Sequence, residues 1–334
     1  MQARARYRAY AWKTALVVGV AFGGLWTATH GVAGVRWADV GSALEEVDPA
    51  RLAMLAVIWL GGLGIYSIVL SAALPGLGVR RGLLLNLSGS AVANAVPLGG
   101  AVATALNWRM VKTWGHSDRA FVAFCILTNA LDVMTKLLLP LVTVATLLAL
   151  SLHVPGVLWL LTACCTGVLV VALLARLALV RPVATGPRQD RGWQSGLRTY
   201  LRDSSARIRA LMVGHWPRLV PASIGYVAAQ VVLLLFALRS VGLDAPVTVV
   251  LTAAAIERLG TLIPVTPGGT GVAEVGTIAW LVAAGLNPVQ AVAGVLLYRV
   301  FLIAMEIPVG GVLLGGWAWL NRTSSRQRAE QVTA

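Results

Sequence analysis

Residues 264 to 274 read Pro-Val-Thr-Pro-Gly-Gly-Thr-Gly-Val-Ala-Glu and break an apolar segment that runs from 246 to 285. A second apolar segment, 83 to 113, is broken in the same way by Pro97-Leu-Gly-Gly100. Proline removes a helix hydrogen bond and glycine weakens a helix, so each break predicts two short helices joined by a turn. We expect two helical hairpins that turn back within the apolar layer. For the second segment, two thin spans of about 20 residues each are the alternative.

The rest of the chain has the composition of a membrane protein. Of its 334 residues, 58% are hydrophobic and 12% are charged, whereas soluble domains carry about 25% charged residues. An apolar run of about 20 residues crosses a hydrocarbon core of about 30 Å as a helix. The expected full spans are 12–29, 52–74, 120–150, 156–180, 219–238 and 289–319. The predicted fold class is an all-α polytopic membrane protein with about six transmembrane helices and two re-entrant helical hairpins.

Lys and Arg residues collect on one side of these spans. Most of the 27 lie near the two termini, around 80–81 and 109–119, and in or beside a basic loop at 181–217. Because such residues accumulate in cytoplasmic loops, we expect both termini in the cytoplasm of a bacterial plasma membrane. The net charge of +14 is then a collar that faces lipid headgroups, and no nucleic-acid partner is expected.

The two hairpins lie in segments of matched spacing. The matched residues are 168 to 170 positions apart: Gly99 and Gly268, Gly100 and Gly269, Gly115 and Gly285, Pro140 and Pro308. This spacing predicts an internal repeat within one membrane domain, with units at about 52–150 and 219–319 in opposite orientations. Inverted repeats with broken helices are typical of secondary transporters. The alternative is that Pro and Gly only kink ordinary membrane helices.

The hairpin tips are candidate anion sites. A helix that starts at a tip presents free N–H groups and the positive end of its dipole, and glycine lets a ligand approach the backbone. The candidate headgroup ligands at the tips are Asn94, Pro97, Gly99, Gly100, Thr266, Pro267, Gly268 and Gly269. The glycines are not followed by the Lys-Ser/Thr of a nucleotide-binding loop.

Ionisable residues inside the apolar segments complete the candidate site. Charges at such depth are costly and usually face a partner or a cavity. Arg258 and Arg299 are the candidate partners of a phosphate, because a guanidinium can hold an oxyanion with two hydrogen bonds, and Glu274 follows the second tip. We interpret the other buried charges as intramembrane pairs: Asp132, Lys136, Glu257 and Glu306. Structural ion pairing between helices is the alternative for all of these residues.

Two peripheral segments have amphipathic patterns. Residues 37–48 suit a helix on the outer interface, and 197–211 form a basic pattern suited to anionic headgroups. Structural collar helices are the alternative for both segments.

The segment from Pro264 to Glu274, together with Gly285 and Tyr298-Arg299, resembles the signature of the flippase-like family. This family is the membrane region of lysylphosphatidylglycerol synthases and its stand-alone relatives. The resemblance covers roughly residues 50 to 318 and implies a lipid-translocating membrane domain. The signature positions match Pro267, Gly268, Gly269, Glu274 and Arg299. Full-length synthases continue into a soluble aminoacyl-transfer domain, whereas this chain ends shortly after its last span, so synthase activity is not expected.

Other chemistry has no sequence pattern to support it. The His residues are scattered without the spacing of metal ligands, and the Cys residues lie in apolar runs. No metal or cofactor is expected. We expect a flippase or transporter of an anionic phospholipid or lipid-linked molecule that works by alternating access, with membrane lipids as its partners. The alternatives are a lipid headgroup-modifying membrane enzyme and an accessory subunit of such an enzyme; a homo-oligomer is compatible with each.

Overall fold

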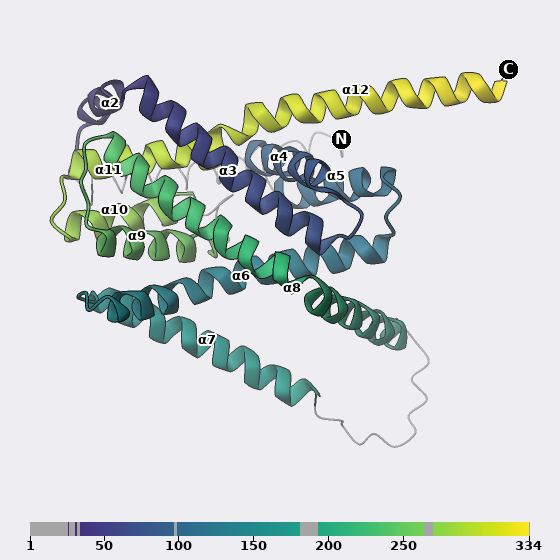
Figure 1. Cartoon of the computed structure of the whole chain (residues 1–334), viewed down its shortest axis with the longest axis horizontal. Helices are drawn as coiled ribbons and strands as arrows, with labels where there is room; N and C mark the ends of the chain where they lie inside the picture. The colour runs from purple at the N-terminus through teal and green to yellow at the C-terminus, as the bar shows by residue number, and fades with distance from the viewer. Residues whose placement is uncertain are drawn as a thin grey trace, which may run out of the picture.

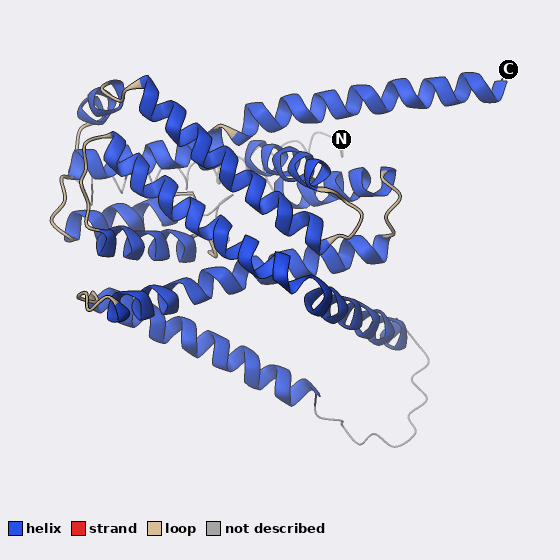
Figure 2. Cartoon of the chain, viewed as in Figure 1, coloured by secondary structure: helices blue, strands red, loops and turns tan. Residues whose placement is uncertain are grey.

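The computed structural model describes residues 34–96, 99–180, 193–263 and 270–333, together with Trp26 and Gly31. Within these ranges the secondary structure is helical and no strand is present (Figure 2). The helices that are long and apolar enough to cross a membrane are Pro49–Ala73, Asp118–Ala149, Gly156–Leu174, Ala206–Ser240 and Pro288–Asn321. They coincide with five predicted spans, so the all-α membrane fold class is confirmed at this level. The predicted span at 12–29 lies outside the described residues, apart from Trp26.

The helices follow one another in two similar series. The first series is α2 (Trp37–Glu45), α3 (Pro49–Ala73), α4 (Val79–Ala95), α5 (Gly99–Thr113), α6 (Asp118–Ala149) and α7 (Gly156–Val180). The second is α8 (Trp193–Ser240), α9 (Val247–Gly260), α10 (Val272–Ala283), α11 (Pro288–Arg299), the π-helix η3 (Val300–Ala304) and α12 (Glu306–Thr333). Each series places a helical pair between long helices.

The broken apolar segments form the two expected helical pairs. Helices α4 and α5 have 17 and 15 residues and pack against each other, as do α9 and α10 with 14 and 12 residues. At about 1.5 Å per residue the longest of these rises only about 26 Å, less than the hydrocarbon thickness of about 30 Å. The lengths favour hairpins over thin spans in the second segment. The tip residues 97–98 and 264–269 lie outside the described residues.

The two predicted units meet where their first long helices pack against each other. Helices α3 and α8 run side by side from upper left to lower right in Figure 1 and contact each other. Small residues allow this approach, since a Cβ added to Gly62 would lie 3.4 Å from Ala229, and one added to Gly225 would lie 3.4 Å from Ile65. The same packing brings the rings of Tyr66 and Tyr226 to a centroid distance of 4.6 Å.

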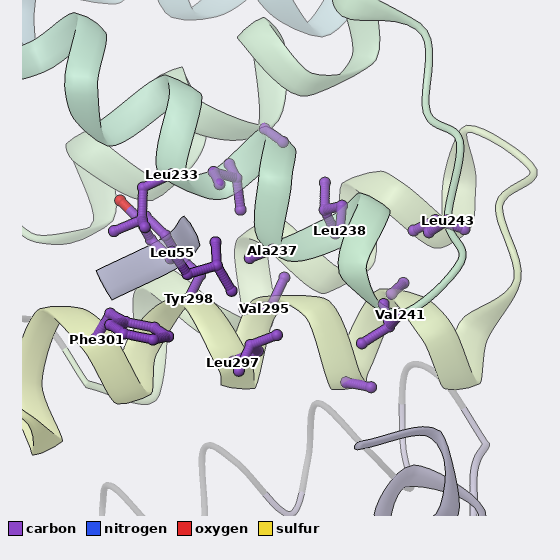
Figure 3. Packing of buried hydrophobic residues seen from close by; sticks show 14 of the residues in the cluster. Leu55, Leu233, Ala237, Leu238, Val241, Leu243, Val295, Leu297, Tyr298 and Phe301 are labelled. Atoms are coloured by element: carbon purple, nitrogen blue, oxygen red, sulfur yellow. The ribbon is translucent and has the colours of Figure 1, made fainter. Parts of the chain in front are cut away.

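Two apolar cores lie at opposite ends of α3. The core of the second unit joins α3, α8 and α11 (Figure 3), with members that include Leu55, Leu233, Leu238, Val295 and Tyr298. The core of the first unit joins the other end of α3 to α4, α5, α6 and α8, with members that include Leu70, Leu85, Met110, Phe121 and Leu219. Each core therefore borrows the first helix of the other unit, which ties the two units together.

Helix α8 extends further than its predicted span. The basic segment 181–217 was expected to be a loop separate from the span at 219–238, but α8 is continuous from Trp193 to Ser240. The helix changes direction between these parts in Figure 1, and Pro217 and Pro221 lie inside it. Proline removes a backbone donor and accounts for such a bend. Ile208 and Leu211 pack against the core of the first unit, which supports the collar-helix alternative for this segment.

The last span contains a wider turn that the sequence analysis did not predict. Helix α11 ends at Arg299, the π-helix η3 follows, and α12 begins at Glu306. Pro308 explains the wider turn, because its ring would collide with the carbonyl of Ala304 in a regular α-helix and it has no N–H to donate. Arg299 and Glu306 therefore do not keep the register of a regular α-helix.

Helix α2 lies against the second unit. Val40 and Val47 are buried in the core that contains α11, and α2 contacts α11 directly. This packing favours the structural alternative for 37–48, although Trp37 remains exposed.

Candidate functional site

Four charged side chains meet beside the second hairpin. Glu257 and Arg258 lie on the last turn of α9, Glu274 lies on the first turn of α10, and Arg299 ends α11. The hairpin brings the end of α9 next to the start of α10, and the core contacts of α11 place Arg299 beside both. We call these four residues the ion-pair cluster.

Glu257 is the centre of the ion-pair cluster. Its Oε1 lies 2.7 Å from Nη2 of Arg258 and 3.2 Å from Nη1 of Arg299. Its Oε2 accepts hydrogen bonds from Nε of Arg258 and from the hydroxyl of Tyr298, the latter at 3.4 Å. One carboxylate thus binds two guanidinium groups, one from its own helix and one from α11.

Glu274 joins the cluster to the second hairpin tip. Its Oε1 lies 2.8 Å from Nε of Arg299, and its Oε2 accepts a hydrogen bond from the backbone N–H of Gly271 at 2.7 Å. Gly271 precedes α10 with φ +95°, a conformation that favours glycine. A carboxylate from the chain itself therefore caps the helix start at which the sequence analysis placed an anionic headgroup.

The ion-pair cluster is buried and electrically balanced. Glu257, Glu274 and Arg299 are 1%, 3% and 7% exposed. Two carboxylates and two guanidinium groups sum to zero net charge at neutral pH. Because an uncompensated buried charge is expensive, these residues stabilise one another and hold α9, α10 and α11 in one arrangement.

Two polar residues that hydrogen-bond to the ion-pair cluster were given no role by the sequence analysis. Gln230, on α8, accepts a hydrogen bond from Nη1 of Arg258 at 2.5 Å, and Tyr298 accepts one from Nη2 of Arg258 at 3.1 Å. Gln230 is an isolated amide within the apolar run Val227–Phe236, and this contrast was the available signal. Tyr298 was noted only as part of the family signature.

The first hairpin contains no such cluster. Asn94, near the end of α4, donates from Nδ2 to Oε2 of Glu306 on α12 at 3.5 Å. Gly99 starts α5 against the last turn of α4, so that an added Cβ would lie 2.6 Å from the carbonyl oxygen of Val92, whereas Gly100 faces open space. Glu306, which was expected to be one of the paired charges, has no Lys or Arg partner among the described residues.

A cavity lies beside the first hairpin instead. Its volume is about 330 Å³, within the range of about 300–1,000 Å³ that is usual for small-molecule sites. Side chains of α3, α4, α5 and α6 line it, and none of them is charged. The polar lining consists of Tyr66, Asn86, Ser90, Thr104, Asn107, Thr128 and Asn129. Oδ1 of Asn107 is buried and has no hydrogen-bond partner within the described part of the chain.

The remaining predicted residues are placed as follows. Asp132 and Lys136 form a pair on α6, with Nζ 2.7 Å from Oδ2. Pro97, Thr266, Pro267, Gly268 and Gly269 lie outside the described residues. The structure thus brings together Arg258, Glu257, Glu274 and Arg299 in one place and Asn94 with Glu306 in another.

A family model described as the lysylphosphatidylglycerol synthase TM region matches residues 12–310. No curated protein matches the chain.

Proposed function

Because the chain belongs to the lysylphosphatidylglycerol synthase TM-region family, we propose that it is a flippase or transporter of an anionic phospholipid or a lipid-linked molecule. In this proposal the units at 52–150 and 219–319 are inverted repeats that expose a headgroup site to the two sides in turn. The distribution of Lys and Arg supports cytoplasmic termini in a bacterial plasma membrane.

The ion-pair cluster is the observation that carries this proposal. Ionisable residues inside a membrane are expensive and are found mainly where a substrate or ion passes. Here four of them lie together, next to a helix pair that is too short to span the membrane. Packed hydrophobic side chains of similar volume often stabilise a protein as well as a buried ion pair does, or better. The presence of the cluster therefore indicates a functional role and not stability alone.

Arg299 supplies a route from headgroup binding to hairpin motion. It holds carboxylates from two helices, Glu257 on α9 and Glu274 on α10. A lipid phosphate that binds Arg299 replaces one of these carboxylates, because both compete for the same planar set of donors. The exchange releases one helix of the hairpin from α11. A ligand that binds the released arrangement more tightly shifts the population toward it.

Reconstitution into vesicles with fluorescent anionic phospholipids tests the proposal. We expect the wild-type protein to accelerate transbilayer movement and Arg299→Gln to reduce the rate to that of protein-free vesicles. Arg299→Lys keeps the charge but loses the bidentate geometry, and an intermediate rate is expected. Arg36→Gln is the matched control, since the Arg36 side chain is 81% exposed. No acceleration with any anionic headgroup would contradict the proposal.

Extraction of the same lipids separates transport from headgroup modification. If the protein only moves lipids, their chemical composition is the same with wild-type protein and with Glu274→Gln. A covalent change that depends on Glu274 would instead favour the enzyme alternative.

A further inference from the structure

Glu306 is a buried carboxylate without a positive partner. It is 8% exposed and accepts a hydrogen bond from Nδ2 of Asn94 at 3.5 Å, and the hydroxyl of Ser90 on α4 lies near it. Among the described residues, no Lys or Arg forms an ion pair with it. Glu257 and Glu274, at similar depth, are both held by guanidinium groups.

The groups that face Glu306 do not compensate its charge. The titratable side chains near it are the phenols of Tyr66 on α3 and Tyr226 on α8. The carboxylate of Asp132 on α6 also lies near these two phenols and adds a negative charge, not a positive one. Lys136 is bound to Asp132, and Arg258 is bound to Glu257. An ionised carboxylate in these surroundings is unfavourable because nothing compensates its lost hydration, and the neutral acid avoids this penalty.

The two polar neighbours of Glu306 suit both of its protonation states. Asn94 donates to one oxygen in either state. The hydroxyl of Ser90 can donate to a carboxylate and can equally accept from the O–H of a carboxylic acid. Neither state leaves the side chain without partners.

Glu306 lies between two cavities. On one side it lines a small cavity of about 10 Å³, close to the lower limit for one water molecule. Trp59 lines this cavity too, and its Nε1 is buried without a partner among the described residues. On the other side Ser90 is part of the wall of the 330 Å³ cavity. Polar groups therefore lie on either side of the carboxyl.

The carboxyl also lies beside a close contact between α12 and α4. Gly310 is one turn after Glu306, and a Cβ added to it would overlap the carbonyl oxygen of Leu87 on α4. Positions four apart share a helix face, so Glu306 and Gly310 both face α4. The negative charge of an ionised Glu306 attracts water into this contact, whereas the neutral acid leaves it dry.

We propose that Glu306 binds and releases one proton, and that its protonation state controls the packing of α12 on α4. In the neutral state the carboxyl has taken a proton from water and α12 lies closely on α4. Release of the proton to water leaves one negative charge, and the contact loosens as the carboxylate becomes hydrated. The proposal concerns a proton site and does not require that lipids move.

Infrared difference spectroscopy at low and high pH tests the proton site. We expect the carbonyl band of a protonated carboxylic acid to decrease as the pH rises in the wild-type protein, to shift in Glu306→Asp, and to be lost in Glu306→Gln. Glu46→Gln, at an exposed position, should leave the band unchanged. A band that is the same in wild type, Glu306→Gln and Glu306→Asp would overturn the proposal.

Hydrogen exchange of α4 tests the effect on packing. Intrinsic exchange accelerates with pH equally in all variants, so the difference between variants is the readout. We expect the α4 amides to lose protection with rising pH in wild type and not in Glu306→Gln, which stays neutral. Equal loss of protection in both proteins would overturn the coupling between protonation and packing.

A pH gradient across the vesicles extends the test to transport, and this arm rests on the proposed function. We expect lipid movement that depends on the gradient in wild type and is independent of it in Glu306→Gln. Lipid movement that is independent of the gradient in both proteins would overturn the link between the protonation of Glu306 and transport, and nothing else. Absence of lipid movement under every gradient contradicts the proposed function. The infrared and hydrogen-exchange tests of Glu306 do not depend on this outcome.

Discussion

The two hairpins are followed by the same turn. Gly115 and Gly285 have φ of +86° and +84°, the left-handed conformation that commonly ends a helix. In each turn the glycine N–H donates to the carbonyl three residues before it, and the next N–H donates to the carbonyl five residues before it. Ser117 and Asn287 then cap α6 and α11 with their side chains. The same local solution at matched positions supports the proposed repeat.

The units also exchange contacts in a reciprocal way. Helix α12 of the second unit packs on α4 of the first hairpin, and α6 of the first unit packs on α9 of the second hairpin. Helices α3 and α8, which open the units, pack against each other. Each hairpin is thus enclosed by its own first helix and by the last helix of the other unit.

The chemistry of the two units differs despite this shared frame. Subtracting 169 from the positions of Glu257, Arg258 and Arg299 gives Ser88, Gly89 and Ala130, none of which is charged. The second hairpin holds ion pairs at close packing, and the first holds an uncharged cavity. Turns and contacts between helices are shared by the two units. A few side chains decide whether a hairpin holds closely packed ion pairs or an uncharged cavity.

The largest expected effect comes from breaking the ion-pair cluster. Arg299→Gln leaves Glu257 and Glu274 buried with less positive charge, and breaking a buried pair costs about 3–5 kcal/mol. Thermal unfolding in detergent should show a large drop in melting temperature, and adding Glu274→Gln should recover part of it. Ala130→Gln, at the matched position of the first unit, should cost less. Equal losses at 130 and 299 would remove the distinction between the units.

A smaller effect is expected from the glycines where the helices of each hairpin touch. A Cβ on Gly260 would lie 2.8 Å from Cα of Ala273, whereas a Cβ on Gly89 would lie 2.8 Å from Nδ2 of Asn107. Backbone cannot move aside without shifting α10, so Gly260→Ala should cost about 1–3 kcal/mol. The amide of Asn107 can rotate away, and Gly89→Ala should cost less. Denaturant titration of both variants measures the difference, and a reversed order would contradict the open character of the first hairpin.

The amide of Asn107 sharpens the contrast further. Its Oδ1 has no partner within the described part of the chain, so Asn107→Leu should be close to neutral for stability. If the cavity receives a polar headgroup, the same variant should slow lipid movement in vesicles. Thr113→Leu, outside the cavity lining, is the control for an added apolar side chain on α5. A large loss of stability in Asn107→Leu would show that the amide has a structural role.

Much of the helix arrangement could be predicted from the sequence. Pro and Gly cannot continue a helix at low cost, so the breaks at Pro97 and Pro267 predicted the two helix pairs. Apolar runs predicted the positions of the spans, although α8 begins well before its predicted start. The span expected at 52–74, for example, is α3 at Pro49–Ala73. These features depend on local backbone chemistry, which a single sequence contains.

The partners inside the site could not be predicted in the same way. Arg299 and Glu306 are seven apart, which in a regular α-helix puts them on one face, but η3 lies between them and changes the register. Arg299 consequently faces α9 and α10, and Glu306 faces α4. Such pairings depend on how separate helices pack. Gln230 shows the same limit, because its partner Arg258 is on another helix.

The smallest expected effect concerns the turn that both units share. His116 follows Gly115, and the equivalent residue after Gly285 is Leu286. Burial and the nearby guanidinium of Arg81 lower the pKa of His116, so below about pH 6.5 the folded protein binds fewer protons at this residue than the unfolded chain does. Its contribution to stability is therefore present above that pH and is lost as the pH falls. His116→Leu, which copies the second unit, should reduce the drop in melting temperature between about pH 7.5 and about pH 5.5. Since a leucine at this position cannot titrate, an unchanged drop would mean that the acid sensitivity arises elsewhere in the molecule.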